Sequence, residues 1–142
     1  MTADAPAPGR FEPPVTDEAA AFWSATERRE LVLPWCTSCG EAFWYPRPVC
    51  PRCLSPDVEW RPASGRGEVY AVSVNAPAGP SGDVQPRAVR IADALVEVDQ
   101  CDLLTNVVDV DADDVRVGME VAVTWEPMSD GRNLPVFAPA SA

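Results

Sequence analysis

The sequence contains no lysine and no histidine, so every basic side chain is an arginine. Without histidine the chain lacks the commonest general base and cannot build a histidine-ligated metal site; without lysine it cannot form a Schiff base. No apolar run approaches the roughly 20 residues that a membrane-spanning helix needs. The first ten residues lack the apolar segment of a secretory signal, which predicts a cytoplasmic protein.

Positive charge is scarce as well. The 142 residues carry 11 basic against 22 acidic side chains, for a net charge of −11. The imbalance is concentrated in residues 67–142, where 13 acidic residues and 4 arginines give a net charge of −9. Proteins that bind nucleic acids or anionic membranes obtain much of their affinity from cations, so we expect neither partner.

Four of the five cysteines form two Cys-x-x-Cys pairs, Cys36 with Cys39 and Cys50 with Cys53, separated by the ten residues 40–49. Two such turns joined by a hairpin can place four thiolates about 2.3 Å from one zinc ion. Disulfides need an oxidising compartment, which nothing in the sequence indicates. Iron accepts the same four sulfurs, so a rubredoxin-like electron carrier remains an alternative. A four-thiolate site has no open coordination position, which predicts structural zinc and no catalytic residue.

The residues beside the cysteines differ between the two pairs. Gly40 follows the first pair, where a left-handed backbone helps N–H groups to reach sulfur. Leu54 holds the equivalent position after the second pair, which predicts a less regular turn there. The fifth cysteine, Cys101, stands among acidic residues with no histidine to activate it, so we expect a packed thiol.

A helix is predicted over residues 17–30, with Thr16 as its cap and Arg28 and Arg29 in its last turn. Large aromatic side chains occur on this helix and between the cysteine pairs. They either pack on the chain's own metal hairpin or bind another subunit. The candidate partner-binding residues are Phe22, Trp23, Trp44 and Tyr45.

From Gly65 onward the pattern becomes that of a β protein, with Gly65-Arg66-Gly67 as a flexible joint. The predicted strands are 68–74, 89–98, 103–110, 119–125 and 134–137, with a long loop over 75–86. Tyr70 is expected on the same face as Val72, and a bulge near Asp93 explains a shift in the apolar phase. Five short strands joined mostly by hairpins fit a small closed barrel such as an OB-fold.

Arginines gather on or beside the cysteine segment, and three of them are candidates for contacts with an anion such as the phosphate of an acidic cofactor. They are Arg47, Arg52 and Arg66. Together with the aromatic rings they also leave open an OB-fold that binds single-stranded nucleic acid, although the net charge opposes it.

These elements predict a mainly β chain with an N-terminal helix, a rubredoxin-like zinc ribbon and a five-stranded OB-fold barrel. The predicted domains are a tail and helix over 1–33, a zinc ribbon over 34–64 and an OB-fold over 65–142.

The order of motifs resembles a known family. The helix with Phe22-Trp23 leads through Leu31-Val32-Leu33 to the first cysteine pair. Then come Pro46-Arg47-Pro48-x-Cys50-Pro51-x-Cys53, Gly65-Arg66-Gly67-x-Val69-Tyr70, Leu95-Val96-Glu97-Val98 and Val115-Arg116-Val117-Gly118-Met119-x-Val121. Over residues 17–138 this series resembles the zinc-ribbon/OB-fold proteins of the DUF35 type.

The resemblance implies an accessory subunit of thiolase-superfamily enzymes. Members of the family accompany acyl-CoA thiolases, lipid-transfer-type aldolases of steroid side-chain breakdown and some acyl-CoA hydratases. The implied role is to dock on the enzyme in a hetero-oligomer and support its acyl-CoA site, with the catalytic residues in the partner. Two positions depart from the family pattern: Leu54 replaces a usual glycine, and Asp99-Gln100-Cys101-Asp102 replaces a turn that usually contains glycine.

Overall fold

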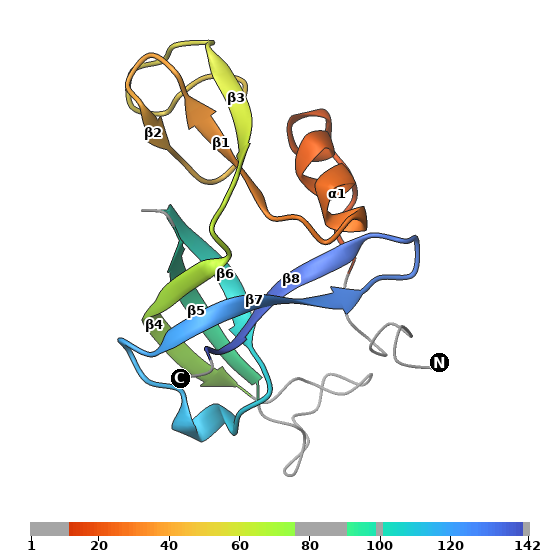
Figure 1. Cartoon of the computed structure of the whole chain (residues 1–142), viewed down its shortest axis with the longest axis vertical. Helices are drawn as coiled ribbons and strands as arrows, with labels where there is room; N and C mark the ends of the chain where they lie inside the picture. The colour runs from red at the N-terminus through yellow and green to blue at the C-terminus, as the bar shows by residue number, and fades with distance from the viewer. Residues whose placement is uncertain (1–11, 76–90, 99–100, 141–142) are drawn as a thin grey trace. The chain divides into compact units, whose positions relative to one another are not determined.

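The computed structural model describes residues 12–75, 91–98 and 101–140 (Figure 1). Its helices are η1 (Asp17–Ala19), α1 (Ala20–Glu27) and η2 (Ala112–Asp114). Its strands are β1 (Val32–Cys36), β2 (Glu41–Ala42), β3 (Val58–Pro62), β4 (Arg66–Asn75), β5 (Ile91–Val98), β6 (Cys101–Val107), β7 (Glu120–Pro127) and β8 (Asn133–Pro139). The predicted fold class is confirmed. None of the described helices is long and apolar enough to span a bilayer.

The chain divides into two compact units, each described here by itself. One unit holds the described residues from 12 to 65 together with Cys101 and Trp125–Pro135. The other holds the remaining described residues, from Arg66 onward, which include most of the barrel strands. The predicted ranges 1–33, 34–64 and 65–142 stay a prediction. The predicted loop over 75–86 and the turn at Asp99-Gln100 lie largely outside the described residues.

The helix α1 is shorter than the predicted span because a left-handed residue ends it. Arg29 has φ of 56°, and the backbone N–H groups of Arg29 and Glu30 donate to the carbonyls of Thr26 and Ala25. This is the Schellman arrangement, which terminates a helix. Arg28 and Arg29 therefore lie beyond the last turn. Thr16 is the N-cap residue of η1, as predicted, but its side chain makes no capping bond; its carbonyl accepts from the Ala19 N–H.

The tip of the β7–β8 hairpin holds α1, although the two segments lie more than 100 residues apart in the chain. The Asn133 side-chain amide donates to the Thr26 carbonyl at 2.9 Å, and both residues are buried. The Arg132 guanidinium lies 4.7 Å from the centroid of the Trp23 ring and bonds to Asp130 at 2.8 Å. These contacts stabilise a helix of only eight residues, which alone would be marginal.

A three-stranded antiparallel sheet in the order β2-β1-β3 forms the metal ribbon. Its register pairs Trp35 with Glu59 and Cys36 with Val58, so β1 is the central strand and β3 an outer one (Figure 1).

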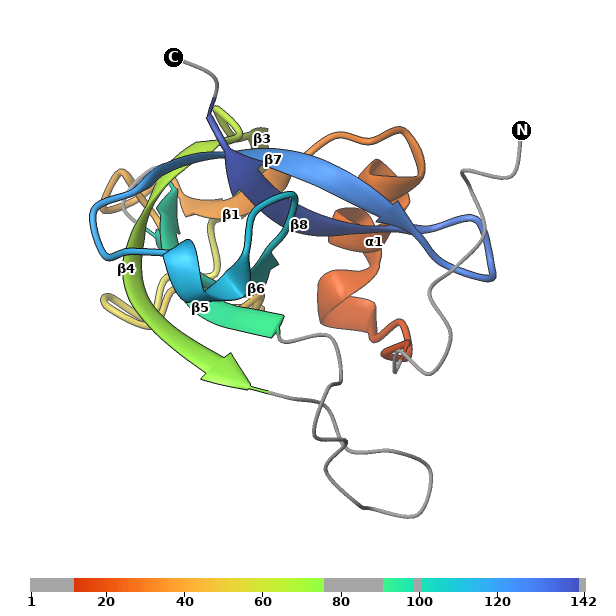
Figure 2. The same ribbon diagram turned by 90° about the horizontal axis from the view of Figure 1, so that it is seen from below.

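The remaining strands close a barrel in the order β4-β5-β6-β8-β7 (Figure 2). The register shift lies on β4 between Val69 and Ala71, whereas Asp93 pairs regularly with Ser73, so the bulge predicted near Asp93 is misplaced. Tyr70 lies at this register shift and is 63% exposed, whereas Val69 before it lies in the core.

Gly65 ends the first unit at the predicted joint, whereas Arg66 and Gly67 already belong to strand β4. Arg66 and Gly67 pair with Ala122 and Val121 of β7. A Cβ atom on Gly67 would lie 2.6 Å from a methyl carbon of Val96, so the close approach of β4 and β5 requires glycine there.

Replacing Asn133 by alanine should lower the free energy of unfolding by about 1–3 kcal/mol, because the buried Thr26 carbonyl loses its donor. The control Asn75→Ala, at the exposed end of β4, should change it by less than about 0.5 kcal/mol. Urea unfolding curves measure both variants. Equal effects would show that the hairpin tip does not stabilise α1.

Candidate metal centre

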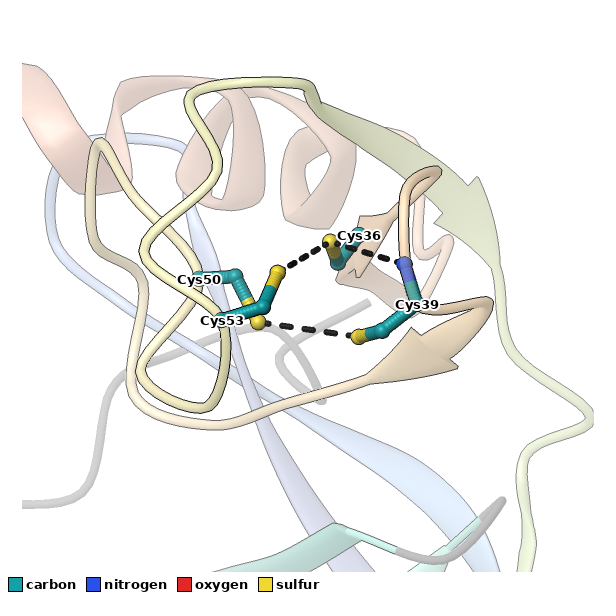
Figure 3. A group of neighbouring side chains, drawn as sticks. All are labelled: Cys36, Cys39, Cys50 and Cys53. Carbon is teal, nitrogen blue, oxygen red and sulfur yellow. Dashed lines mark hydrogen bonds between the residues drawn. The ribbon is translucent and has the colours of Figure 1, made fainter.

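The four paired cysteines meet at one end of the ribbon. Cys36 ends β1, Cys39 lies in the turn before β2, and Cys50 and Cys53 lie in the loop before β3 (Figure 3). Their Sγ atoms all lie within 4.8 Å of one another, with 3.6 Å between Cys36 and Cys53 and 3.7 Å between Cys39 and Cys50. Sulfurs at the corners of a zinc tetrahedron lie about 3.8 Å apart, whereas disulfide sulfurs lie about 2.05 Å apart. The cluster therefore fits a four-thiolate metal site and not two disulfides.

The two cysteine turns have the same backbone conformation. Gly40 has φ of 76° and its N–H donates to the Cys36 carbonyl at 2.9 Å. Leu54 has φ of 62° and its N–H donates to the Cys50 carbonyl at 2.8 Å. The second turn is thus as regular as the first, contrary to the prediction. Leu54 adopts the left-handed conformation that costs an L-residue about 1–2 kcal/mol.

Backbone N–H groups and neighbouring sulfurs give the thiols unequal acidity. Hydrogen bonds from the backbone of Cys53, and also of Arg52, lower the pKa of the Cys50 thiol to about 6. The hydrogen bond with the Cys36 sulfur raises the pKa of the Cys39 thiol to about 12. Four adjacent sulfurs cannot all ionise without a positive charge among them, and a divalent cation supplies that charge.

The ribbon has a small core of its own. Cys36 and Cys50 are fully buried and pack with Phe43, and Val58 packs against this cluster. A core of this size does not stabilise a fold alone, which is the usual reason for a structural metal. The loops are also joined directly, since Ser38 and Ser55 hydroxyls lie 2.8 Å apart and the Thr37 N–H donates to the Asp57 carbonyl.

The aromatic candidates form a series from the interior to the surface. Phe22 and Trp23 are buried within the chain, with 5% and 9% exposure. The Phe22 ring centroid lies 5.0 Å from that of Trp44, which lies 5.8 Å from that of Tyr45. Tyr45 is 51% exposed. Binding of a partner by these four residues stays a prediction, and Tyr45 is the one with the most accessible ring.

The three arginine candidates do not form one cluster within either unit. Arg52 donates to the Ala42 carbonyl at 3.1 Å and lies 3.7 Å from the Glu41 carboxylate. Arg47 lines an open groove of about 350 Å³ in the ribbon unit. Arg66 begins β4 in the other unit. Their contact with a cofactor stays a prediction.

Two features of this unit were not among the predicted site residues. The groove also contains Trp60, whose side chain follows that of Val58 on one face of β3. The apolar alternation of Val58 and Trp60 is the signal that could have identified it. The contact of Arg132 with Trp23 has no sequence signal, because its two residues are joined only by the tertiary fold.

A ribbon with two cysteine turns, followed by a closed five-stranded barrel, defines the class of zinc-ribbon/OB-fold proteins. Residues 23–59 match the family model described as the rubredoxin-like zinc ribbon domain of ChsH2, and residues 60–126 match the model of its C-terminal OB-fold domain. The chain belongs to the DUF35 family, of which ChsH2 is a member.

Solved structures agree with this assignment. The chain is similar to a chain of the Ltp2-ChsH2(DUF35) aldolase, with 32% identity and a TM-score of 0.78. That match covers 92% of this chain and all of the other. A DUF35 protein of unknown function from Sulfolobus solfataricus shares the fold, with 14% identity, a TM-score of 0.63, and coverage of 87% and 86%.

Two curated relatives carry functional names. A "Probable enoyl-CoA hydratase alpha subunit" from Thermomonospora curvata is 35% identical over 130 residues, which is 89% of this chain. This chain spans only 39% of that relative's length. A "DUF35 domain-containing scaffold protein" from Methanothermobacter thermautotrophicus is 28% identical over 119 residues, which is 82% of this chain and 86% of the relative.

Replacing Leu54 by glycine should raise the free energy of unfolding of the metal-loaded protein by about 1 kcal/mol, because the left-handed backbone is no longer strained. The matched change Gly40→Ala should lower it by about 1 kcal/mol, because alanine is strained at the left-handed backbone of this position. No atom lies close enough to clash with the added Cβ, so the backbone is the only cost. Thermal unfolding measures both. A loss of stability in Leu54→Gly would mean that the exposed leucine side chain contributes more than its backbone costs.

Replacing Cys50 by serine should remove stoichiometric metal and unfold the ribbon, because Cys50 is fully buried in the sulfur cluster. Cys101→Ser should retain one zinc per chain, since Cys101 lies outside the cluster. Elemental analysis gives the metal content, and near-UV circular dichroism reports the packing of the tryptophans. Bound iron with visible absorption would favour the electron carrier instead.

Proposed function

We propose that the protein is a non-catalytic, zinc-stabilised accessory subunit of a thiolase-superfamily enzyme that acts on acyl-CoA. In this proposal Cys36, Cys39, Cys50 and Cys53 hold the zinc, and the protein docks on the enzyme and supports its acyl-CoA site. The partner is a thiolase or a lipid-transfer-type retro-aldolase, with steroid side-chain degradation as one context.

The observation that carries the proposal is the full-length similarity to the DUF35 chain in the aldolase structure, at 32% identity. The names of the hydratase and scaffold relatives also support an accessory role beside an acyl-CoA enzyme, since one denotes an acyl-CoA enzyme and the other an assembly role. The hydratase relative is much longer than this chain, so its activity is not transferred to this chain alone.

The chain's own chemistry favours a supporting role. The sequence has no histidine or lysine, and a zinc ion held by four thiolates has no open position for substrate. The remaining cysteine, Cys101, is buried with 4% exposure. When bound, zinc would supply cross-linking of the two cysteine turns and not Lewis-acid catalysis.

The proposal assigns two kinds of contact to the predicted residues, one with the partner enzyme and one with acyl-CoA. Tyr45, supported by Trp44 and Phe22 behind it, offers an exposed aromatic ring of the kind found at interface hot spots. Arg52 and Arg66 are the arginines proposed for contacts with acyl-CoA phosphates. Since the structure leaves these roles untested, they belong to the proposal alone.

Co-expression with a thiolase-superfamily subunit from the same organism should yield a stable complex that survives gel filtration. Tyr45→Ala should weaken that complex, because it removes exposed aromatic area. The barrel variant Leu104→Ala, which removes a still more exposed apolar side chain, serves as the control. Surface plasmon resonance gives the dissociation constants. The proposal fails if the two proteins never associate, or if the isolated chain cleaves an acyl-CoA unaided.

A further inference from the structure

An open groove of about 350 Å³ lies between the start of the helical segment and the outer strand β3, all within the ribbon unit. Its apolar lining comes from Trp60 and Val58 of β3 and from two prolines, Pro48 and Pro56. Val58 also packs against the core that contains Cys36 and Cys50. Val58 therefore connects the lining of the groove with the metal centre.

Charged side chains of opposite sign lie around this groove. Asp17 and Glu18 lie in η1, and Arg47 lies in the loop that also provides Pro48. All three are exposed, and among the described residues none of the three side chains has a hydrogen bond or ion pair. Unpaired charges beside an apolar surface can give a docking surface its specificity at little cost in desolvation.

Trp60, which lines the groove, also lies on the outer edge of the sheet. Antiparallel strands exchange hydrogen bonds at alternate residues, and the pairs Trp35–Glu59 and Leu33–Arg61 alternate with Pro34–Trp60. Pro34 has no N–H, and its carbonyl accepts from Phe43 in the direction of β2. The residue opposite it, Trp60, therefore directs its N–H and C=O away from β1.

Because β3 is an outer strand, the backbone groups of Trp60 lie at a free edge. No hydrogen bond to them is found within residues 12–75, 91–98 and 101–140. Pro56 and Pro62 stand on either side of this position, and proline cannot donate to a sheet ladder. The Val58 N–H already donates to the Pro56 carbonyl, so among the outward-facing residues of β3 only Trp60 can donate a ladder hydrogen bond to an added strand.

We propose that this groove binds an extended segment of the enzyme subunit, which adds to the edge of β3 at Trp60. The segment carries an apolar side chain over Trp60, a basic side chain toward Asp17 and Glu18, and an acidic side chain toward Arg47. This inference rests on the proposed function and names the contact that it would use. For Arg47 it replaces the predicted contact with acyl-CoA.

The charge of the chain favours another protein over a second copy. A second copy would bring a further net charge of −11, and most of it would come from the acidic residues after position 66. A partner segment with one basic and one acidic side chain matches the charges around the groove without that repulsion.

The test uses the complex with the co-expressed thiolase-superfamily subunit as its probe. Arg47→Glu and Glu18→Arg should each raise the dissociation constant about tenfold or more. The double change Arg47→Glu with Glu18→Arg preserves the net charge of −11 and should not restore binding. Arg28→Glu, an exposed position outside the groove lining, is the control with the same charge change and should leave binding intact.

Hydrogen–deuterium exchange of the Trp60 amide distinguishes strand addition from side-chain docking. The amide should exchange rapidly in the isolated, zinc-loaded protein and become protected in the complex. A complex that forms with Trp60 unprotected, or with unchanged affinity in the groove variants, overturns the inference while leaving the proposed function intact. Protection of Trp60 in a dimer of the isolated chain would assign the edge to a second copy and also overturn it. If no complex forms, the proposed function itself fails.

Discussion

The ribbon half of this protein depends on four sulfur atoms that lie close enough together to surround one metal ion. The buried Cys36 and Cys50 form its small core cluster together with Phe43, and strand β3 follows the second cysteine turn. A cation at their centre offsets the mutual repulsion of the thiolates and joins two loops that are otherwise held by a few polar contacts. The groove beside β3 depends on the same centre, because Val58 connects the two.

A second constraint is the attachment of the short helix. The β7–β8 hairpin belongs to the barrel at one end and to the ribbon unit at the other, where Asn133 and Arg132 hold Thr26 and Trp23. Tyr45 and the β3 edge, which the two proposals use, lie in the same unit as this helix.

The cysteine cluster, the barrel and the family could be predicted because local patterns encode them. Two Cys-x-x-Cys turns place sulfurs together almost regardless of the rest of the chain, and alternation of apolar residues defines strands. The left-handed conformation of Leu54 could not be predicted, since leucine disfavours it and only the metal loop imposes it. The bulge at Tyr70 was misplaced because the same phase shift fits either of two paired strands.

By itself the sequence determined the chemistry that this chain can perform, because composition decides which groups exist: five thiols, eleven guanidinium groups and no imidazole or amine side chain. Tertiary structure alone decided which of those groups are available. It buried Phe22 and Trp23, paired Arg52 with Glu41, and left Arg47, Trp60 and Tyr45 accessible. The physical reason is that burial and pairing depend on contacts between segments far apart in the chain, which no local pattern records.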